Sequence, residues 1–94
     1  MSKEAYRKKA EARIEEHQAK LKEARAKAKG ASADARLEVE KLIGKLEKRI
    51  DAAKKKLANV GDAAEDVWED LSKGLDEAWE DVSGGIKKVL SRFK

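Results

Sequence analysis

The apolar positions of residues 67–93 repeat every eleven residues. Two units stand in tandem, VWEDLSKGLDE at 67–77 and AWEDVSGGIKK at 78–88, and both contain Trp-Glu-Asp-x-Ser-x-Gly in register. Eleven residues complete three helical turns at about 3.67 residues per turn, so the repeat returns each side chain to the same helix face. The pattern predicts an amphipathic helix with an apolar stripe of eight large side chains, which we take as an interaction and packing site: Trp68, Leu71, Leu75, Trp79, Val82, Ile86, Leu90 and Phe93.

This apolar stripe, which Val67, Ala78 and Val89 widen along one edge, needs a cover. Burying a large apolar side chain contributes roughly 1.5–3 kcal/mol, so the stripe is worth on the order of 10–20 kcal/mol as an upper bound. Small proteins rarely leave so much apolar surface in water. We therefore expect the stripe to lie against another helix, another chain or a lipid surface.

The earlier part of the chain has the alternating three- and four-residue spacing of a heptad seam. The seam is mostly alanine in its first half, which buries little area but permits close helix approach. From residue 35 onward its steps include one extra four, a stutter. It predicts a long basic helix over residues 3–59. Its members are Ala10, Ile14, His17, Leu21, Ala24, Ala28, Ala31, Ala35, Val39, Leu42, Leu46, Ile50, Ala53, Leu57 and Val60.

The stretch GASAD at 30–34 is compatible with two structures. Gly30 could follow the end of one helix and Ser32 could cap the next, which would make a turn. However, the seam keeps its phase through Gly30, and one glycine inside a helix costs only about 1 kcal/mol. We favour a continuous helix, and the alternative is a three-helix bundle with a turn near 30–32.

A clearer break lies at 59–62, with the sequence NVGD. Gly61 suits the residue that follows a helix, and Asp62 with Glu65 resembles a capping box. The second helix should then cover 62–92, although Gly84 and Gly85 could loosen it. We thus predict an all-α fold in which residues 1–94 form a single helical domain, folded as a long-helix coiled-coil hairpin or bundle and possibly oligomeric.

The charge of the chain changes sign along its length. Residues 1–60 contain 18 Lys and Arg against 10 Asp and Glu, residues 61–86 contain one Lys against nine acidic residues, and residues 87–94 add four basic ones. Blocks of opposite charge predict that the blocks meet, within or between molecules. Since no apolar segment follows the basic start and no run reaches the ~18 apolar residues of a membrane span, we expect a soluble cytoplasmic protein.

Candidate chemical groups are few. The chain has no cysteine, which excludes thiol nucleophiles and thiolate metal sites. The single histidine, His17, lies on the seam without evident metal partners, so we interpret it as a polar residue of the helix contact, with pH sensing as a further hypothesis. The carboxylates at 69–70 and 80–81 lack the ligand spacing and turn of a calcium loop. We therefore expect no enzyme activity, no catalytic, cofactor-binding or metal-binding residues, no cofactor and no small-molecule substrate.

Partners are predicted by the same patterns. Self-association through the two seams fits best. The basic residues Lys87, Lys88, Arg92 and Lys94 flank the end of the stripe and could dock on an anionic membrane surface. Weak nucleic-acid binding through the basic half is the least favoured hypothesis, because its cations alternate with ten acids and its only aromatic residue is Tyr6.

The pattern resembles a family of small bacterial stress-response coiled-coil proteins, often described as apolipoprotein-like. The resemblance rests on Tyr-x-x-Lys at 6–9, the Ala/Lys/Glu-rich stretch to Leu57, the sequence GDAAED at 61–66, and the units containing Trp68 and Trp79. It implies accumulation under heat, salt or osmotic stress without catalytic residues. We thus expect a non-catalytic structural or interaction protein, with a reversible lipid-surface binder as the alternative and a weak nucleic-acid binder as a second alternative.

Overall fold

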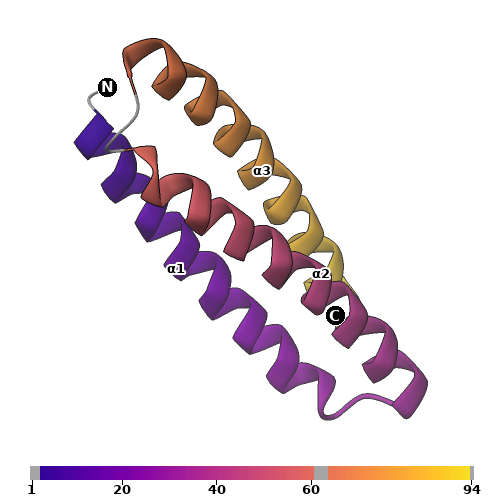
Figure 1. Cartoon of the computed structure of the whole chain (residues 1–94). Coiled ribbons are helices and arrows are strands. Elements are labelled where there is room, and N and C mark those ends of the chain that lie inside the picture. Colours follow the sequence, from indigo (N-terminus) through magenta and orange to yellow (C-terminus); the bar gives the residue numbers. More distant parts are fainter. Residues whose placement is uncertain (1–2, 61–63, 94) are drawn as a thin grey trace.

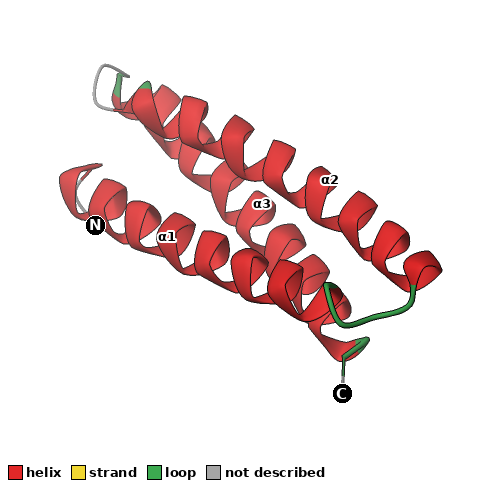
Figure 2. Cartoon of the chain, turned by 90° about the horizontal axis from the view of Figure 1, so that it is seen from below, coloured by secondary structure: helices red, strands yellow, loops and turns green. Residues whose placement is uncertain are grey.

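The chain folds into a bundle of three long helices (Figure 1). The structure is a computed structural model that describes residues 3–60 and 64–93, and its helices are α1 (Lys3–Ala28), α2 (Ala33–Ala58) and α3 (Glu65–Ser91). α1 and α3 run in the same direction and α2 runs against both (Figure 2). The bundle measures 49 × 17 × 16 Å, a width that fits three helices packed around one axis. The predicted all-α class is confirmed.

Residues 29–32 separate α1 from α2, so the favoured continuous helix over 3–59 is wrong and the three-helix alternative is observed. The backbone amides of residues 29–31 each donate to a carbonyl three residues earlier, at 3.1–3.3 Å, which tightens the end of α1. Ser32 caps α2: it has φ −60 and ψ 159, and its hydroxyl accepts from the amide of Ala35. No glycine of the described chain has a positive φ, so Gly30 makes this turn without left-handed backbone.

The seam keeps its phase through Gly30 although the helix ends there, and this has a physical reason. Each helix must turn its own seam toward the common core, whichever way the chain runs. A hairpin therefore preserves the inward-facing pattern on both sides of its turn, and the phase across the turn says nothing about helix continuity.

The predicted stutter in the second half of the seam is absent from α2. The buried positions are Val39, Ile43, Leu46, Ile50, Ala53 and Leu57, which continue to Val60 with strictly alternating steps of four and three. Ile43 has an exposed fraction of 0%, whereas its neighbour Leu42 is only partly buried. The pattern was ambiguous because two large apolar residues are adjacent, and the buried one is Ile43.

α3 remains helical through Ser83, Gly84 and Gly85. Gly85 lies where α3 crosses α2, and a Cβ atom there would lie 2.5 Å from Cδ2 of Leu46. The absent side chain thus permits a close approach between these two helices. The N-cap of α3 is Ala64, which makes no side-chain cap hydrogen bond. Gly61 and Asp62, which were predicted to end one helix and cap the next, lie outside the described residues.

Candidate interaction groove between α1 and α3

The eight residues of the apolar stripe lie in the core or against it. Five are buried and the other three are partly buried and pack on the core cluster. Of the residues at the edge of the stripe, Val89 is buried, Ala78 is partly buried and Val67 is 49% exposed. The chain therefore covers its own stripe with α1 and α2. The buried five are Trp68, Leu75, Trp79, Val82 and Ile86, and the partly buried three are Leu71, Leu90 and Phe93.

α1 contributes the least apolar bulk to this cover. Its buried residues include only two large aliphatic side chains, Ile14 and Leu21; the rest are alanines and His17. The contact between α1 and α3 is also less extensive than either contact that α2 makes. Because three alanines and an imidazole replace large apolar groups, α1 is the helix that the core holds most weakly.

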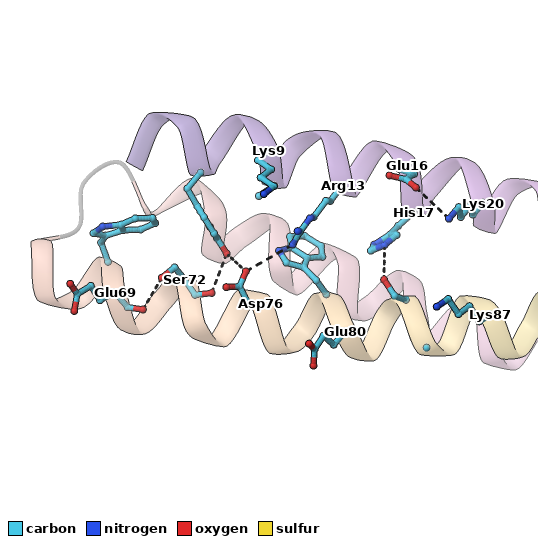
Figure 3. Close-up of a pocket in the computed structure, with 16 residues that line it drawn as sticks. Lys9, Arg13, Glu16, His17, Lys20, Glu69, Ser72, Asp76, Glu80 and Lys87 are labelled. Atoms are coloured by element: carbon cyan, nitrogen blue, oxygen red, sulfur yellow. Dashed lines mark hydrogen bonds and ion pairs between the residues drawn. The ribbon is translucent and has the colours of Figure 1, made fainter. Parts of the chain in front are cut away.

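A groove of about 1160 Å³ follows the boundary between α1 and α3 (Figure 3). The wall from α1 carries the cations Lys9, Arg13 and Lys20 together with Glu16, and the wall from α3 carries the anions Glu69, Asp76 and Glu80 together with Lys87. An ion pair of 4.0 Å between Arg13 and Asp76 crosses it. Four rings also line the groove, and they form two layers described below: Tyr6, His17, Trp68 and Trp79.

The first layer joins Tyr6 of α1 to Trp68 of α3. The ring centroids are 5.0 Å apart and the planes meet at 70°, an edge-to-face arrangement. The Tyr6 hydroxyl lies 3.1 Å from the carbonyl oxygen of Ser72 and 3.0 Å from Oδ1 of Asp76. Since the hydroxyl has one hydrogen, these two acceptors share it. Burial, then the hydrogen bond and charge of Asp76, raise the pKa of Tyr6 to about 12.

The second layer joins His17 of α1 to Trp79 of α3. The ring centroids are 5.8 Å apart at an angle of 55°, and Nε2 of His17 lies 3.2 Å from Oγ of Ser83. Nδ1 is buried and has no hydrogen-bond partner within the described chain. The neutral imidazole can donate from Nε2 and leave Nδ1 as a bare acceptor, whereas a charged ring would bury an unpaired N–H.

Burial accordingly lowers the pKa of His17 below its ordinary value. The negative charge of Glu16 opposes this shift, and the positive charges of Lys20 and Arg13 reinforce it. The helix contact thus disfavours the charged form of His17, which agrees with its interpretation as a polar residue of the seam.

The two layers are related by one eleven-residue step in both helices. Tyr6 and His17 are eleven residues apart, as are Trp68 and Trp79, so both ring pairs have the same sequence offset of 62 (68 − 6 and 79 − 17). The hydrogen bonds to Ser72 and Ser83 share an offset of 66. Tyr6 was not predicted from the sequence as a partner of the stripe. An eleven-residue search of the first thirty residues would have paired Tyr6 with His17.

Trp79 carries an unusual polar atom. Its Nε1 is buried, and it makes no hydrogen bond of acceptable geometry within the described residues, although the indole acts on the pKa of Tyr6 and lowers it. The indole N–H therefore lies near enough to the Tyr6 hydroxyl to affect its pKa, but it makes no well-formed hydrogen bond there. A buried unpaired donor costs stability, which adds to the weakness of the contact between α1 and α3.

The His17–Ser83 pair resembles two members of a hydrolytic triad, but no carboxylate orients Nδ1, because that atom has no partner. In the parts of the chain that the structure describes, no three His, Cys, Asp or Glu side chains are grouped to hold a metal ion. No described helix is both long and apolar enough to cross a membrane. Comparisons with protein-family models, curated proteins and solved structures found no match to the chain.

Proposed function

We propose that this protein is a non-catalytic helical interaction protein in which α2 and α3 form a docking surface and α1 is a replaceable third helix. The observation that carries the proposal is the unequal share of the core: α3 contributes the apolar stripe, whereas α1 contributes alanines, His17 and only two large aliphatic side chains. The favoured partner is another copy of the chain, so the protein self-associates.

The described outer surface of the closed bundle exposes too little apolar area for a partner helix to dock on it, so partner binding should require the bundle to open. Leu37 and Val67 are the exposed large apolar side chains of the described residues, at 59% and 49%. Leu37 lies near the start of α2 and Val67 near the start of α3, and these two helix starts are at opposite ends of the bundle (Figure 1). Two isolated side chains do not make an apolar patch. A partner helix that binds tightly must therefore displace α1 and pack against the stripe that α1 covers.

Light scattering after size-exclusion chromatography tests the proposal through the molar mass, over a wide range of chain concentrations and at low and high salt. We expect dimers or larger species whose fraction rises with concentration. A monomer at every concentration and salt level would overturn self-association. The resemblance in sequence also supports a cytoplasmic stress-response role, which predicts that the chain accumulates under heat, salt or osmotic stress.

Reversible binding to an anionic lipid surface is the second candidate. Lys87, Lys88 and Arg92 are exposed beside the buried end of the stripe, where they would meet anionic headgroups if the bundle opened. Because both indoles are already buried, the useful probe is quenching by brominated anionic lipids rather than a change of emission wavelength. Quenching of Trp68 and Trp79 with co-sedimentation supports this candidate, and unquenched emission with no co-sedimentation argues against it.

A further inference from the structure

We infer that two copies of the chain pair by exchanging α1: residues 29–32 straighten, α1 and α2 become one continuous helix, and each α1 packs against α2 and α3 of the other copy. This inference rests on the proposed function, since it states how self-association occurs. The turn, the seam and the contacts of α1 each contribute an independent argument.

The turn at 29–32 is close to helical already. Its amides donate to carbonyls three residues back, and a continuing helix needs only that they donate to carbonyls four residues back. Ser32 has the φ of a helical residue, −60, and differs in ψ, 159. Since no described glycine has a positive φ, Gly30 needs no escape from the left-handed region. The cap that holds the turn is a long, exposed hydrogen bond of 3.4 Å from Ala35 to Ser32.

The seam favours the straightened form. Ala28 is buried in α1 and Val39 is buried in α2, and the eleven residues that separate them complete three turns of a continuous helix. Straightening therefore produces one helix with a single inward face. That face meets the partner's α2 and α3 in its first half and its own α3 in its second half.

The turn at residues 29–32, which would act as the hinge of the exchange, also suits a crossing of two copies. Two straightened helices would run antiparallel past each other near residue 31, where the seam is alanine and permits close approach. Lys27 and Lys29 precede the hinge, and Asp34 and Glu38 follow it. An antiparallel alignment places the basic arm of one copy against the acidic arm of the other, as the closed turn does within one copy, so a second copy offers the same charge complementarity.

The contacts of α1 are all preserved by exchange. The Arg25–Glu47 ion pair, the Tyr6–Trp68 ring pair and the His17–Ser83 hydrogen bond each join α1 to the rest of the bundle. Each can form equally between copies, so exchange sacrifices none of them. The balance between monomer and dimer then depends on chain concentration and on the hinge.

Hinge variants test this dependence through the dimer dissociation constant. Ala33→Pro suits the closed turn, because Ala33 is the first residue of α2 and Ser32 before it is already extended, but it prevents a continuous helix. We expect a folded monomer. Ser32→Ala should lower the dissociation constant roughly tenfold or more, since each of two hinges loses the cap that only the closed turn uses. The control Gly44→Ala, inside α2 and free of close neighbours, should leave it unchanged.

Chains that carry a single cysteine distinguish exchange from other dimers. One chain carries Arg25→Cys and another Glu47→Cys, and the two are refolded together and treated with a short bis-maleimide. Exchange predicts a covalent heterodimer. Introducing Ala33→Pro into both chains should abolish this heterodimer. Dimers by light scattering without this cross-link would overturn the exchange but leave self-association standing, as would a cross-link that survives Ala33→Pro. Monomers throughout would overturn both.

Discussion

The two eleven-residue units of α3 share a sequence pattern but have different neighbours. Trp68 of the first unit is 8% exposed and meets a tyrosine, whereas Trp79 of the second is 3% exposed and meets a histidine. The Ser72 hydroxyl donates to the carbonyl of Glu69 in its own helix, whereas the Ser83 hydroxyl bonds to His17 of α1. The repeat thus determines which face is buried, and the facing helices determine what each repeated residue does.

The glycines of the two units make the same point. A Cβ at Gly74 would meet no non-local atom within 4 Å, but a Cβ at Gly85 would overlap with Leu46. Only the second glycine is required by packing. The unit that contains Trp79 is therefore the better integrated of the two, with contacts to α1 and to α2, and the predictions below test this difference.

The largest expected effect comes from removing the indoles. Trp79→Ala should lower the free energy of unfolding by about 3–5 kcal/mol, because it opens a cavity in the middle of the core. Trp68→Ala should cost less, about 3 kcal/mol, because its ring lies nearer the end of the bundle and is 8% exposed against 3% for Trp79. Urea unfolding followed by circular dichroism measures both. Val67→Ala is the control, with a change within about 0.5 kcal/mol, and equal losses at 68 and 79 would contradict the comparison.

Alanine at the two repeat glycines should have effects of opposite sign. Gly74→Ala should stabilise the protein by up to about 1 kcal/mol through helix propensity. Gly85→Ala gains the same propensity but forces Leu46 to move within a packed core, which costs about 1–3 kcal/mol, so we expect a net loss of about 1 kcal/mol. Thermal or urea unfolding reports the sign directly. Stabilisation by both substitutions would show that the Leu46 side chain can move aside at little cost.

The repeat serines should differ by a smaller amount. Ser83→Ala removes the partner of a buried imidazole nitrogen and should cost about 1 kcal/mol. Ser72→Ala removes a hydroxyl that bonds only within its own helix, so its effect should stay within about 0.5 kcal/mol. Because both changes bring the same gain in helix propensity, the difference between the two urea midpoints isolates the contact between helices.

The smallest effects should be two opposite dependences on pH. The folded pKa of His17 lies below its unfolded value, so the unfolded chain binds more protons as the pH falls below about 6.5 and stability is lost there. The pKa of Tyr6 is raised from 10.0 to about 12, so the folded chain keeps a proton that the unfolded chain releases, and stability is lost as the pH rises through that range.

Matched variants assign each dependence. Urea midpoints measured against pH should lose the acid component in His17→Gln and keep the alkaline one, and Tyr6→Phe should show the reverse. The difference from the parent chain at each pH removes the contribution of the lysines and carboxylates that titrate elsewhere. If His17→Gln loses stability at acid pH as the parent chain does, the group that titrates lies outside the layer of His17 and Trp79.

The sequence was sufficient for the helical class and for the buried face of α3, because an eleven-residue period can place that face in only one way. It was not sufficient for the turn at Gly30, since a heptad pattern looks the same in a hairpin as in a rod. It also assigned Leu42 rather than Ile43 to the core of α2, because adjacent apolar residues make the phase ambiguous. The pairing of Tyr6 with Trp68 required the relative alignment of two helices sixty residues apart.

Because the rings of α1 and the rings of α3 share one eleven-residue spacing, the length of the turn at 29–32 determines which rings face each other. Rings spaced equally along two parallel helices can face each other at more than one relative position of the helices. Sliding α1 by three turns, about 16.5 Å, would bring Tyr6 opposite Trp79 instead of Trp68. The four residues that tie α1 to α2 are too short to allow that slide, so the length of the connection selects an alignment that the rings alone leave degenerate.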